Sequence, residues 1–258
     1  MGVIAAVAAA VALAATPQQF VMSHQLPSGA FAEDGARPDV TLTAWAVLGL
    51  RASRMAVDDS YLRAHEDELQ TPTARALAAL AEARPSEDLL DRVARDRIGG
   101  AINAAAWKLL ALAQARRPLP RSDVRFLLTH QSRNGGWGWG VDVAADSNDT
   151  AAVVEALRAG RVGGRPIRRA LAYLRTLQNR DGGFELVSGR GSDAQSTAWS
   201  IQAFLAAGKP PGAAAFRYLA RLRRDDGSFR YSSRYAATPV WVTAQVLPAL
   251  ARRAFPLR

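Results

Sequence analysis

The chain of 258 residues contains no cysteine, only three histidines and only two lysines. The absence of cysteine excludes disulfides, thiolate zinc sites and cysteine nucleophiles. The histidines, His24, His65 and His130, occupy matching places in three copies of a repeated segment. We therefore interpret them as structural or surface residues and predict neither a metal site nor a cofactor.

The scarcity of lysine affects how the net charge of +10 is interpreted. Because only Lys108 and Lys209 are lysines, the other 31 of the 33 basic residues are arginines. They are spread over the polar faces of the expected helices, and no basic motif with interleaved aromatics stands out. This pattern favours solvated outer faces without a specific nucleic-acid partner. The alternative is that the basic faces contact an anionic polymer, a membrane surface or a protein partner.

No charged residue occurs within the first fifteen positions. Residues 3–15 form an Ala-rich apolar run that is too short for a comfortable membrane span. The triplet at 12–14, Ala-Leu-Ala, resembles a signal-peptide cleavage site, although a positively charged start is missing. We predict that residues 1–15 are an export leader and that the protein is exported. A leading helix of a cytoplasmic protein is the alternative.

An eight-residue apolar segment recurs along the rest of the chain. Its clearest copy, TAWAVLGL, spans 43–50, and further copies lie at 73–80, 105–112, 150–157 and 197–204. We place a weaker sixth copy, PVWVTAQV, at 239–246. The third position holds Trp45, Trp107, Trp199 and Trp241 in four of these copies. Each copy is apolar around most of its circumference, which predicts a helix buried on all sides.

A second, amphipathic segment precedes each copy and predicts an outer helix with one Arg-rich face. The two segments are joined by a turn that ends in an aromatic residue, in its clearest copies after Gly-Gly. These aromatics are Phe31, Trp137, Phe184 and Phe229. Six hairpins in a row would leave two open ends, whereas six in a ring leave none. We therefore predict an all-α fold, an (α/α)6 toroid over residues 16–258, with an open solenoid as the alternative.

The order of an aromatic and leucine, then glutamine, then Gly-Gly and an aromatic resembles the QW-type repeat of squalene and terpenoid cyclases. The beta subunits of protein prenyltransferases are similar. The resemblance covers roughly 17–253 and is clearest at 173–184 and 126–137. It implies a single toroid domain. It leaves the function open, because relatives of this repeat include enzymes, vitamin carriers and complement-type domains.

Class II cyclases that this repeat resembles protonate their substrate with an Asp-x-Asp-Asp motif. The matching segment here is Asp146-Ser147-Asn148-Asp149, so Asn148 replaces the family's central proton donor. A neutral amide cannot act as a strong acid. Asp146 precedes Thr150 by the same spacing as Asp39 precedes Thr43, which favours a helix N-cap. Asp149, with Asp146, is left as the candidate for a displaced catalytic acid. The zinc site that the prenyltransferase resemblance implies, built from Asp, Cys and His, lacks its cysteine.

The tryptophans are the remaining candidates for a binding site. Trp45, Trp107, Trp199 and Trp241 either pack outward against the outer helices or line a pocket for an apolar or cationic ligand. Trp137 and Trp139 lie on the longest Gly-rich turn, and we predict that this pair faces a ligand.

Three functions follow from these observations. The leading hypothesis is a non-catalytic toroid that binds an isoprenoid, another apolar or amphiphilic small molecule, or a protein partner. The chain has room for one helical domain, whereas the triterpene cyclases it resembles carry two, which favours this hypothesis. The second is an isoprenoid cyclase-like enzyme that uses Asp149 or Asp146. The third is a carbohydrate-active (α/α)6 enzyme, with candidate carboxylates Glu33, Asp34, Asp142 and Asp146.

Overall fold

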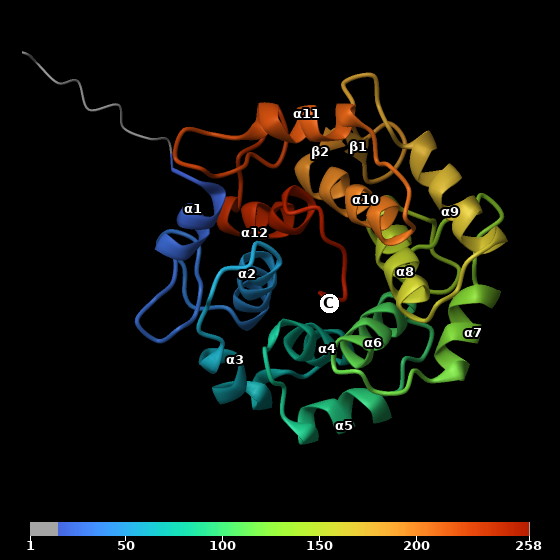
Figure 1. Ribbon diagram of the computed structural model, residues 1–258, viewed down its shortest axis with the longest axis horizontal. Helices are drawn as coiled ribbons and strands as arrows, with labels where there is room; N and C mark the ends of the chain where they lie inside the picture. Colours follow the sequence, from blue (N-terminus) through green and yellow to red (C-terminus); the bar gives the residue numbers. More distant parts are fainter. Residues whose placement is uncertain (1–14, 258) are drawn as a thin grey trace, which may run out of the picture.

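The computed structural model describes residues 15–257, which form two concentric layers of α-helices around a central axis (Figure 1). The inner helices are α2 (Val40–Ala52), α4 (Pro72–Ala81), α6 (Ile102–Gln114), α8 (Ser147–Ala159), α10 (Ala194–Ala206) and α12 (Pro239–Leu250). The outer helices are α1 (Pro17–Ser23), α3 (Ser60–Ala64), α5 (Glu87–Arg95), α7 (Arg121–Thr129), α9 (Arg165–Thr176) and α11 (Ala213–Leu222). A 3₁₀ turn, η1 (Glu66–Glu68), follows α3, and a short antiparallel pair, β1 (Phe184–Glu185) and β2 (Ser192–Asp193), precedes α10.

The inner helices close into a ring. Each packs against the next along the chain, and α12 packs against α2. The outer layer closes at the same point, because Gly227 in the last turn lies against the backbone of Thr16. The prediction of an all-α toroid is therefore confirmed, and the open-solenoid alternative is wrong.

A threonine at the start of four inner helices holds the preceding turn in place. The hydroxyl oxygen of Thr43 accepts a hydrogen bond from the backbone N–H of Phe31 at 2.9 Å. The same bond recurs from Trp137 to Thr150, from Phe184 to Thr197 and from Phe229 to Thr243, each at 2.9 Å. The four turn aromatics are 0–1% exposed, as expected for residues that fill the space between hairpins.

This contact corrects the register of the sixth repeat. The threonine equivalent to Thr43 is Thr243, so Gln245 occupies the position that Trp45 holds in the first repeat. Trp241 lies one helical turn earlier and is not equivalent to the other three tryptophans. The separation between turn aromatic and threonine, 12 to 14 residues in all four bonds, is the sequence signal that identifies the correct register.

The glycines of the turns are needed where the turn meets the next outer helix. Gly182 has φ +87°, and a Cβ there would lie 2.6 Å from the carbonyl oxygen of Ala214. The preceding glutamine completes the turn, since the Gln178 side-chain amide donates to the Gly182 carbonyl at 3.0 Å. Gln131 does the same for Gly135 at 2.8 Å. The repeated Gln and Gly are therefore structural.

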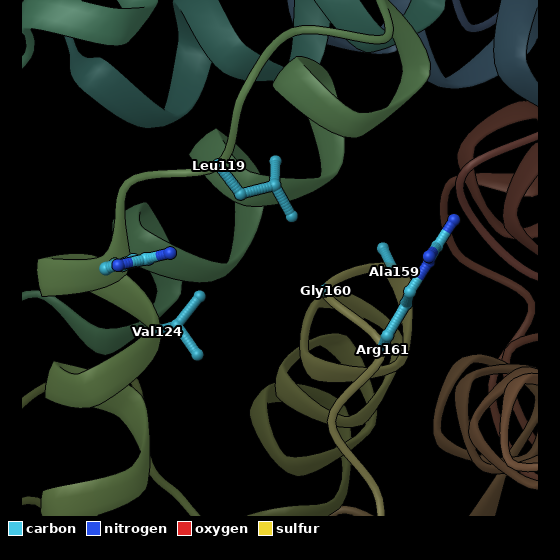
Figure 2. A pocket seen from close by; sticks show the side chains of 6 residues that line it. Leu119, Val124, Ala159, Gly160 and Arg161 are labelled. Atoms are coloured by element: carbon cyan, nitrogen blue, oxygen red, sulfur yellow. The ribbon is translucent and has the colours of Figure 1, made fainter.

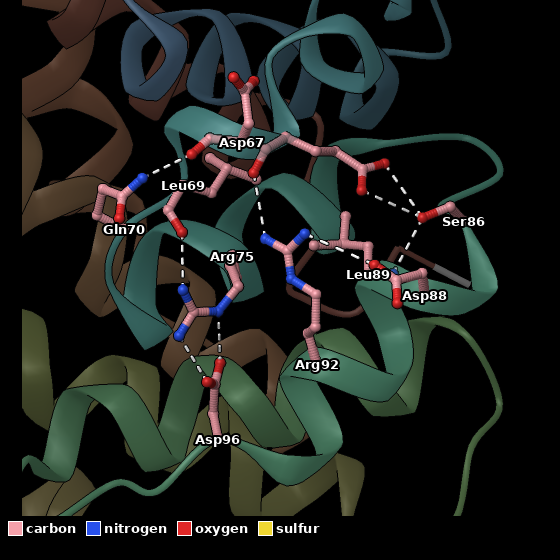
Figure 3. Close-up of polar contacts among 10 residues, drawn as sticks. Asp67, Leu69, Gln70, Arg75, Ser86, Asp88, Leu89, Arg92 and Asp96 are labelled. Atoms are coloured by element: carbon pink, nitrogen blue, oxygen red, sulfur yellow. Dashed lines mark hydrogen bonds and ion pairs between the residues drawn. The ribbon is translucent and has the colours of Figure 1, made fainter.

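In the second and third hairpins, where the turns are shortened, charged side chains connect the elements (Figure 3). Arg75 of α4 makes a two-point contact with the Asp96 carboxylate at 2.9 and 2.6 Å and donates to the Leu69 carbonyl at 2.7 Å. Arg92 of α5 donates to the Glu66 carbonyl at 3.2 Å. Two-point arginine–carboxylate contacts are strong and directional. They connect the elements on this side of the ring, where neither shortened turn ends in an aromatic residue.

Residues 1–14 of the expected leader lie outside the described residues. Ala15 belongs to the ring, because its carbonyl accepts from Arg223 at 2.9 Å. Within residues 15–257, every helix is too short or too polar to cross a bilayer.

Candidate functional site on the axis of the toroid

Three indoles meet on the axis of the ring. Trp45, Trp107 and Trp199 come from α2, α6 and α10, which alternate around the ring. Their ring centroids are 5.4, 5.6 and 5.5 Å apart, with interplanar angles of 79° to 87°. This is the edge-to-face arrangement that aromatic pairs prefer. The three side chains, which we call the indole triad, therefore point inward and fill the axis at their level.

The outward-packing interpretation of these tryptophans is wrong for the triad, whose members are only 3–8% exposed. Trp241 lies against the triad at 6.3 Å from Trp45. Gln245 replaces a fourth indole and accepts from Trp199 Nε1 at 3.0 Å. The same Gln245 oxygen accepts from the Gln195 amide at 2.8 Å. The apolar indole triad is therefore bordered on one side by the polar groups of Gln195 and Gln245.

The two tryptophans of the long turn occupy different surroundings. Trp137 is 0% exposed and donates from Nε1 to the Leu127 carbonyl at 2.8 Å, so the prediction that it faces a ligand is wrong. Its neighbour Trp139 is 58% exposed. The carbonyl of Trp139 accepts from the Asn103 N–H at 3.1 Å, which fixes this turn over the start of α6.

Asp146 and Asp149 form a carboxyl pair at the start of α8. Asp146 is the N-cap, and its Oδ1 accepts from the Asp149 N–H at 2.8 Å. Asp39 and Asp193 cap their helices in the same way, at 2.6 and 2.7 Å, which confirms the capping interpretation. The two carboxyl groups are also close enough to influence each other's pKa.

Asp149 has the strongly raised pKa of this pair. Burial and then the charge of Asp146 raise the pKa of Asp149 to about 8. Burial also raises the pKa of Asp146, whose carboxylate is stabilised by the N–H groups of the helix start. The pair thus holds one neutral acid at neutral pH. Asn148, between them, cannot supply a proton.

A second buried acid lies on the other side of the indole triad. Ala152 occupies the triad position of α8, with Asp149 three residues before it and Glu155 three residues after it. At 1.5 Å per residue, these two acids lie about 4.5 Å to either side of the triad level along α8. Glu155 is 0% exposed, and burial raises its pKa well above the ordinary value.

The end of the chain crosses the ring on the Glu155 side. After α12 the chain turns inward, and its C-terminal end lies at the centre of the ring (Figure 1). The Phe255 ring contacts Trp199, with centroids 6.1 Å apart, and the Phe255 N–H donates to the Glu155 carboxylate. Sequence reasoning missed this segment because residues 251–257 have no counterpart in the repeat.

The other candidates do not form a site. Glu33 accepts from the backbone N–H groups of Val240 and Trp241 and so caps α12. Asp34 is exposed and pairs with His24 at 3.2 Å, while Asp142 is exposed on the long turn. Glu33, Asp34 and Asp146, candidates of the carbohydrate-active hypothesis, therefore each have a separate structural partner. Each histidine bonds through Nδ1 to the carbonyl four residues earlier, at 2.8 Å in all three copies, as structural residues do. Residues 15–257 contain no group of three or more His, Asp or Glu arranged to hold a metal ion.

Two hollows on the surface lie away from the indole triad. One, of about 350 Å³, separates Leu119 and Val124 from Ala159, Gly160 and Arg161 (Figure 2). Another, of about 790 Å³, lies between the β1–β2 loop and residues 231–237 and is lined largely by polar side chains. Neither includes Asp149 or Glu155.

Known structures share the toroid. ent-Copalyl diphosphate synthase from Streptomyces platensis aligns with a TM-score of 0.56 and 21% identity over 83% of this chain, which spans only 50% of that synthase. The type II terpene cyclase MstE from Scytonema aligns with a TM-score of 0.66 and 16% identity over 91% of this chain and 95% of the cyclase. Haptocorrin in complex with Cbi aligns with a TM-score of 0.60 and 15% identity over 92% of this chain and 66% of haptocorrin. At these identities the likeness shows the fold alone.

The match to MstE corrects one argument from the sequence. The alignment covers 91% of this chain and 95% of MstE, so a type II terpene cyclase can be about as long as this chain. The length of the chain is therefore no argument against a cyclase.

No curated protein sequence matches the chain. The sequence profile of the squalene-hopene cyclase C-terminal domain matches residues 77–257, more than half of the chain. The chain therefore belongs to the squalene-hopene cyclase C-terminal domain family.

Proposed function

We propose that this toroid binds an apolar or amphiphilic small molecule of the isoprenoid class and does not convert it. The observation that carries the proposal is the indole triad on the axis, an apolar centre bordered by Gln195, Gln245 and the buried acids of α8. Ligand sites of this composition, mostly aromatic with a few placed polar groups, are typical of small-molecule binding.

Two features support binding over conversion. Asn148 occupies the position of the central acid in the cyclase motif. The triad also fills the axis at its level, where a cyclising enzyme would need room to hold a long polyprenoid in a folded shape. The ligand class is supported by structural neighbours, since a variant of MstE was solved with geranylgeranyl dihydroxybenzoate as substrate and Candida albicans protein geranylgeranyltransferase-I with GGPP.

Farnesol and geranylgeraniol are suitable probes. We expect each to change the intrinsic tryptophan fluorescence saturably and to add one ligand mass to the protein in native mass spectrometry. Trp139→Phe removes the exposed indole and serves as the control, because the change should persist in this variant. The proposal fails if neither alcohol binds to the wild type, to this control, or to a variant in which alanine replaces a side chain that fills the ring centre.

A second function, an isoprenoid cyclase-like activity, is favoured by the carboxyl pair. A neutral carboxylic acid with a pKa of about 8 can act as a proton donor, as other buried acids do in catalysis. In this second function the O–H bond of Asp149 breaks and its proton adds to an alkene carbon, which leaves a carboxylate on Asp149 and a carbocation on the substrate.

Product analysis separates the two functions. Purified protein is incubated with linear polyprenoids, and products are identified by mass spectrometry. A cyclic product from the wild type that is lost in Asp149→Asn would establish catalysis. Asp146→Asn should reduce the rate, because Asp149 loses the neighbour that keeps its proton. No product across the substrate panel supports the binding function.

Export is also part of the proposal and is tested separately. N-terminal sequencing of protein from the native host should find a start near Ala15, whose carbonyl accepts from Arg223. An intact Met1 or Gly2 would contradict export.

A further inference from the structure

The segment that crosses the ring, residues 254–257, is held by few contacts. The six inner helices follow one another around the ring in chain order, so α6 lies opposite α12. The segment leaves α12 and reaches α6, where the Leu257 carbonyl accepts from the Gln114 side-chain amide at 3.3 Å. Midway, the Phe255 N–H donates to Glu155 of α8. The segment therefore spans the diameter of the ring, with one hydrogen bond to α8 and one to α6.

Phe255 accounts for most of the apolar contact. Its side chain is 3% exposed and packs against Trp199 of the indole triad. Pro256 and Leu257 are only partly buried. The segment thus inserts the Phe255 side chain into the axis, and its other residues lie across the opening.

The walls beside this segment carry unused polar atoms. Glu155 Oε1, Gln202 Oε1 and Gln114 Oε1 are buried and have no hydrogen-bond partner among residues 15–257. Glu155 and Gln202 occupy equivalent positions on the neighbouring helices α8 and α10, five residues after Thr150 and Thr197. Buried polar atoms normally have partners, because an unpaired one loses its hydrogen bonds to water without replacement. Three unpartnered polar atoms at one end of the axis indicate a place built for hydrogen-bonding groups that the segment does not fully provide.

An opening already reaches this place from the surface. A cavity of about 300 Å³ lies beside the segment, and its lining includes Glu155, Arg158, Ala206 and Phe255. The lining of this cavity includes Phe255 and does not include Trp199.

We propose that residues 254–257 occupy the ligand site of this toroid and are displaced when the ligand binds, a proposal that rests on the binding function above. The site is the end of the axis bounded by Trp199, Glu155, Gln202 and Gln114. Its ligand has an apolar body that replaces the Phe255 ring and a hydroxyl or amide group that forms hydrogen bonds with the unpartnered oxygens. An isoprenoid alcohol has this chemistry, whereas the corresponding hydrocarbon has no hydrogen-bonding group.

The first test measures the segment itself in the unaltered full-length protein. Hydrogen exchange of peptides covering 251–257 is followed with and without saturating farnesol. Displacement breaks the bond between Phe255 and Glu155, so we expect exchange in this peptide to become at least tenfold faster. Unchanged or slower exchange, with farnesol bound, would overturn the proposal and leave the binding function intact.

The second test weakens the segment. Phe255→Ala removes the ring that competes with the ligand, so a larger fraction of molecules is open, and farnesol should bind at least tenfold more tightly. Phe20→Ala, at a half-buried phenylalanine of α1 away from the axis, is the matched control and should leave the affinity unchanged within about twofold. Equal affinities in all three proteins would overturn the proposal.

The third test addresses the polar end. Farnesene, the hydrocarbon counterpart, should bind more weakly than farnesol to the wild type. Glu155→Leu should abolish this preference, whereas Glu155→Gln, which keeps an acceptor oxygen, should retain it. If farnesol and farnesene bind alike to the wild type, the proposed acceptor site is wrong. If neither binds even to Phe255→Ala, the binding function itself fails. Circular dichroism checks that each variant is folded, and the exchange experiment requires no variant.

Discussion

Burial raises the pKa of two carboxyls that face the axis from α8, Asp149 and Glu155. Each interrupts an otherwise apolar helix, and neither is required by the repeat, because Leu42 and Leu48 occupy the equivalent positions of α2. A buried acid that is retained at a cost in stability is a functional candidate on physical grounds.

The cost of Asp149 should be visible in the pH dependence of stability. Its pKa is about 8 in the folded protein and about 3.9 in an unfolded chain. Between these values the unfolded chain releases the proton and the folded protein keeps it, so the free energy of unfolding falls as the pH rises from 4 to 8. Asp149→Asn removes this dependence, and we expect a gain of about 1–3 kcal/mol at pH 8. Urea denaturation at pH 5 and pH 8 measures it.

Asp58 is the control for this measurement. It is exposed, and its hydrogen bonds with Ser60 lower its pKa, so its ionised form is favoured in the folded protein. Asp58→Asn should therefore give no gain at pH 8. A gain of equal size in both variants would mean that net charge, and not the buried acid, sets the effect.

For single residues, the sequence predicts the helix caps but not the direction in which the tryptophan side chains point. An aspartate just before an apolar helix has one favourable role, and Asp39, Asp146 and Asp193 all perform it. A tryptophan in a helix that is apolar on all sides can face either layer. The overlooked signal is the alternation: Trp45, Trp107 and Trp199 occur in every second repeat, as expected for large side chains that share one axis.

At the scale of helices and turns, the threonine at the start of an inner helix is the clearest position for testing stability by substitution. Thr197→Val keeps the shape of the side chain but leaves the buried N–H of Phe184 without an acceptor. We expect a loss of about 1–3 kcal/mol in the free energy of unfolding, measured by chemical denaturation. Thr176→Val on the exposed face of α9 is the control and should change stability by less than about 0.5 kcal/mol.

The turn glycines allow backbone strain to be separated from close packing. Gly182 and Gly189 both have positive φ, +87° and +85°, but only at Gly182 would a Cβ meet a neighbouring backbone, at 2.6 Å. Gly189→Ala should cost about 1 kcal/mol, the strain of a left-handed residue with a side chain. Gly182→Ala should cost at least about 2 kcal/mol more, because α11 must move away. Equal losses in thermal or chemical denaturation would contradict this account of the turn.

Helices and turns were predictable because their periodicity and glycines are local signals. The register of α12 was not predictable. Trp241 invites alignment with Trp45, but the threonine that fixes the register, Thr243, lies two residues after Trp241, whereas Thr43 lies two residues before Trp45. A feature defined by a contact between a turn and a helix is better found from the spacing between them than from a single conspicuous residue.

For the whole molecule, ring closure could be predicted from the count of six hairpins, because a closed ring buries every inner helix. How the centre is filled could not. It depends on side chains from three non-adjacent helices and on residues 254–257, which lie outside the repeat. The same fold with smaller side chains at these positions would leave an open centre.

The indole triad should therefore stabilise the ring as one unit. Trp45 contacts Trp107, Trp199 and Trp241, at 5.4, 5.6 and 6.3 Å, and so joins α2 to three other inner helices. Trp45→Ala should lower the free energy of unfolding by about 3–5 kcal/mol, the usual cost of truncating a buried tryptophan. Trp139→Ala, which removes the exposed indole, should cost less than about 0.5 kcal/mol.

The double variant Trp45→Ala, Trp107→Ala should lose less stability than the sum of the losses in its single variants, because each single variant already loses the contact between the two indoles. Additive losses in chemical denaturation would show that the indoles fill space independently and that the axis is not a cooperative unit.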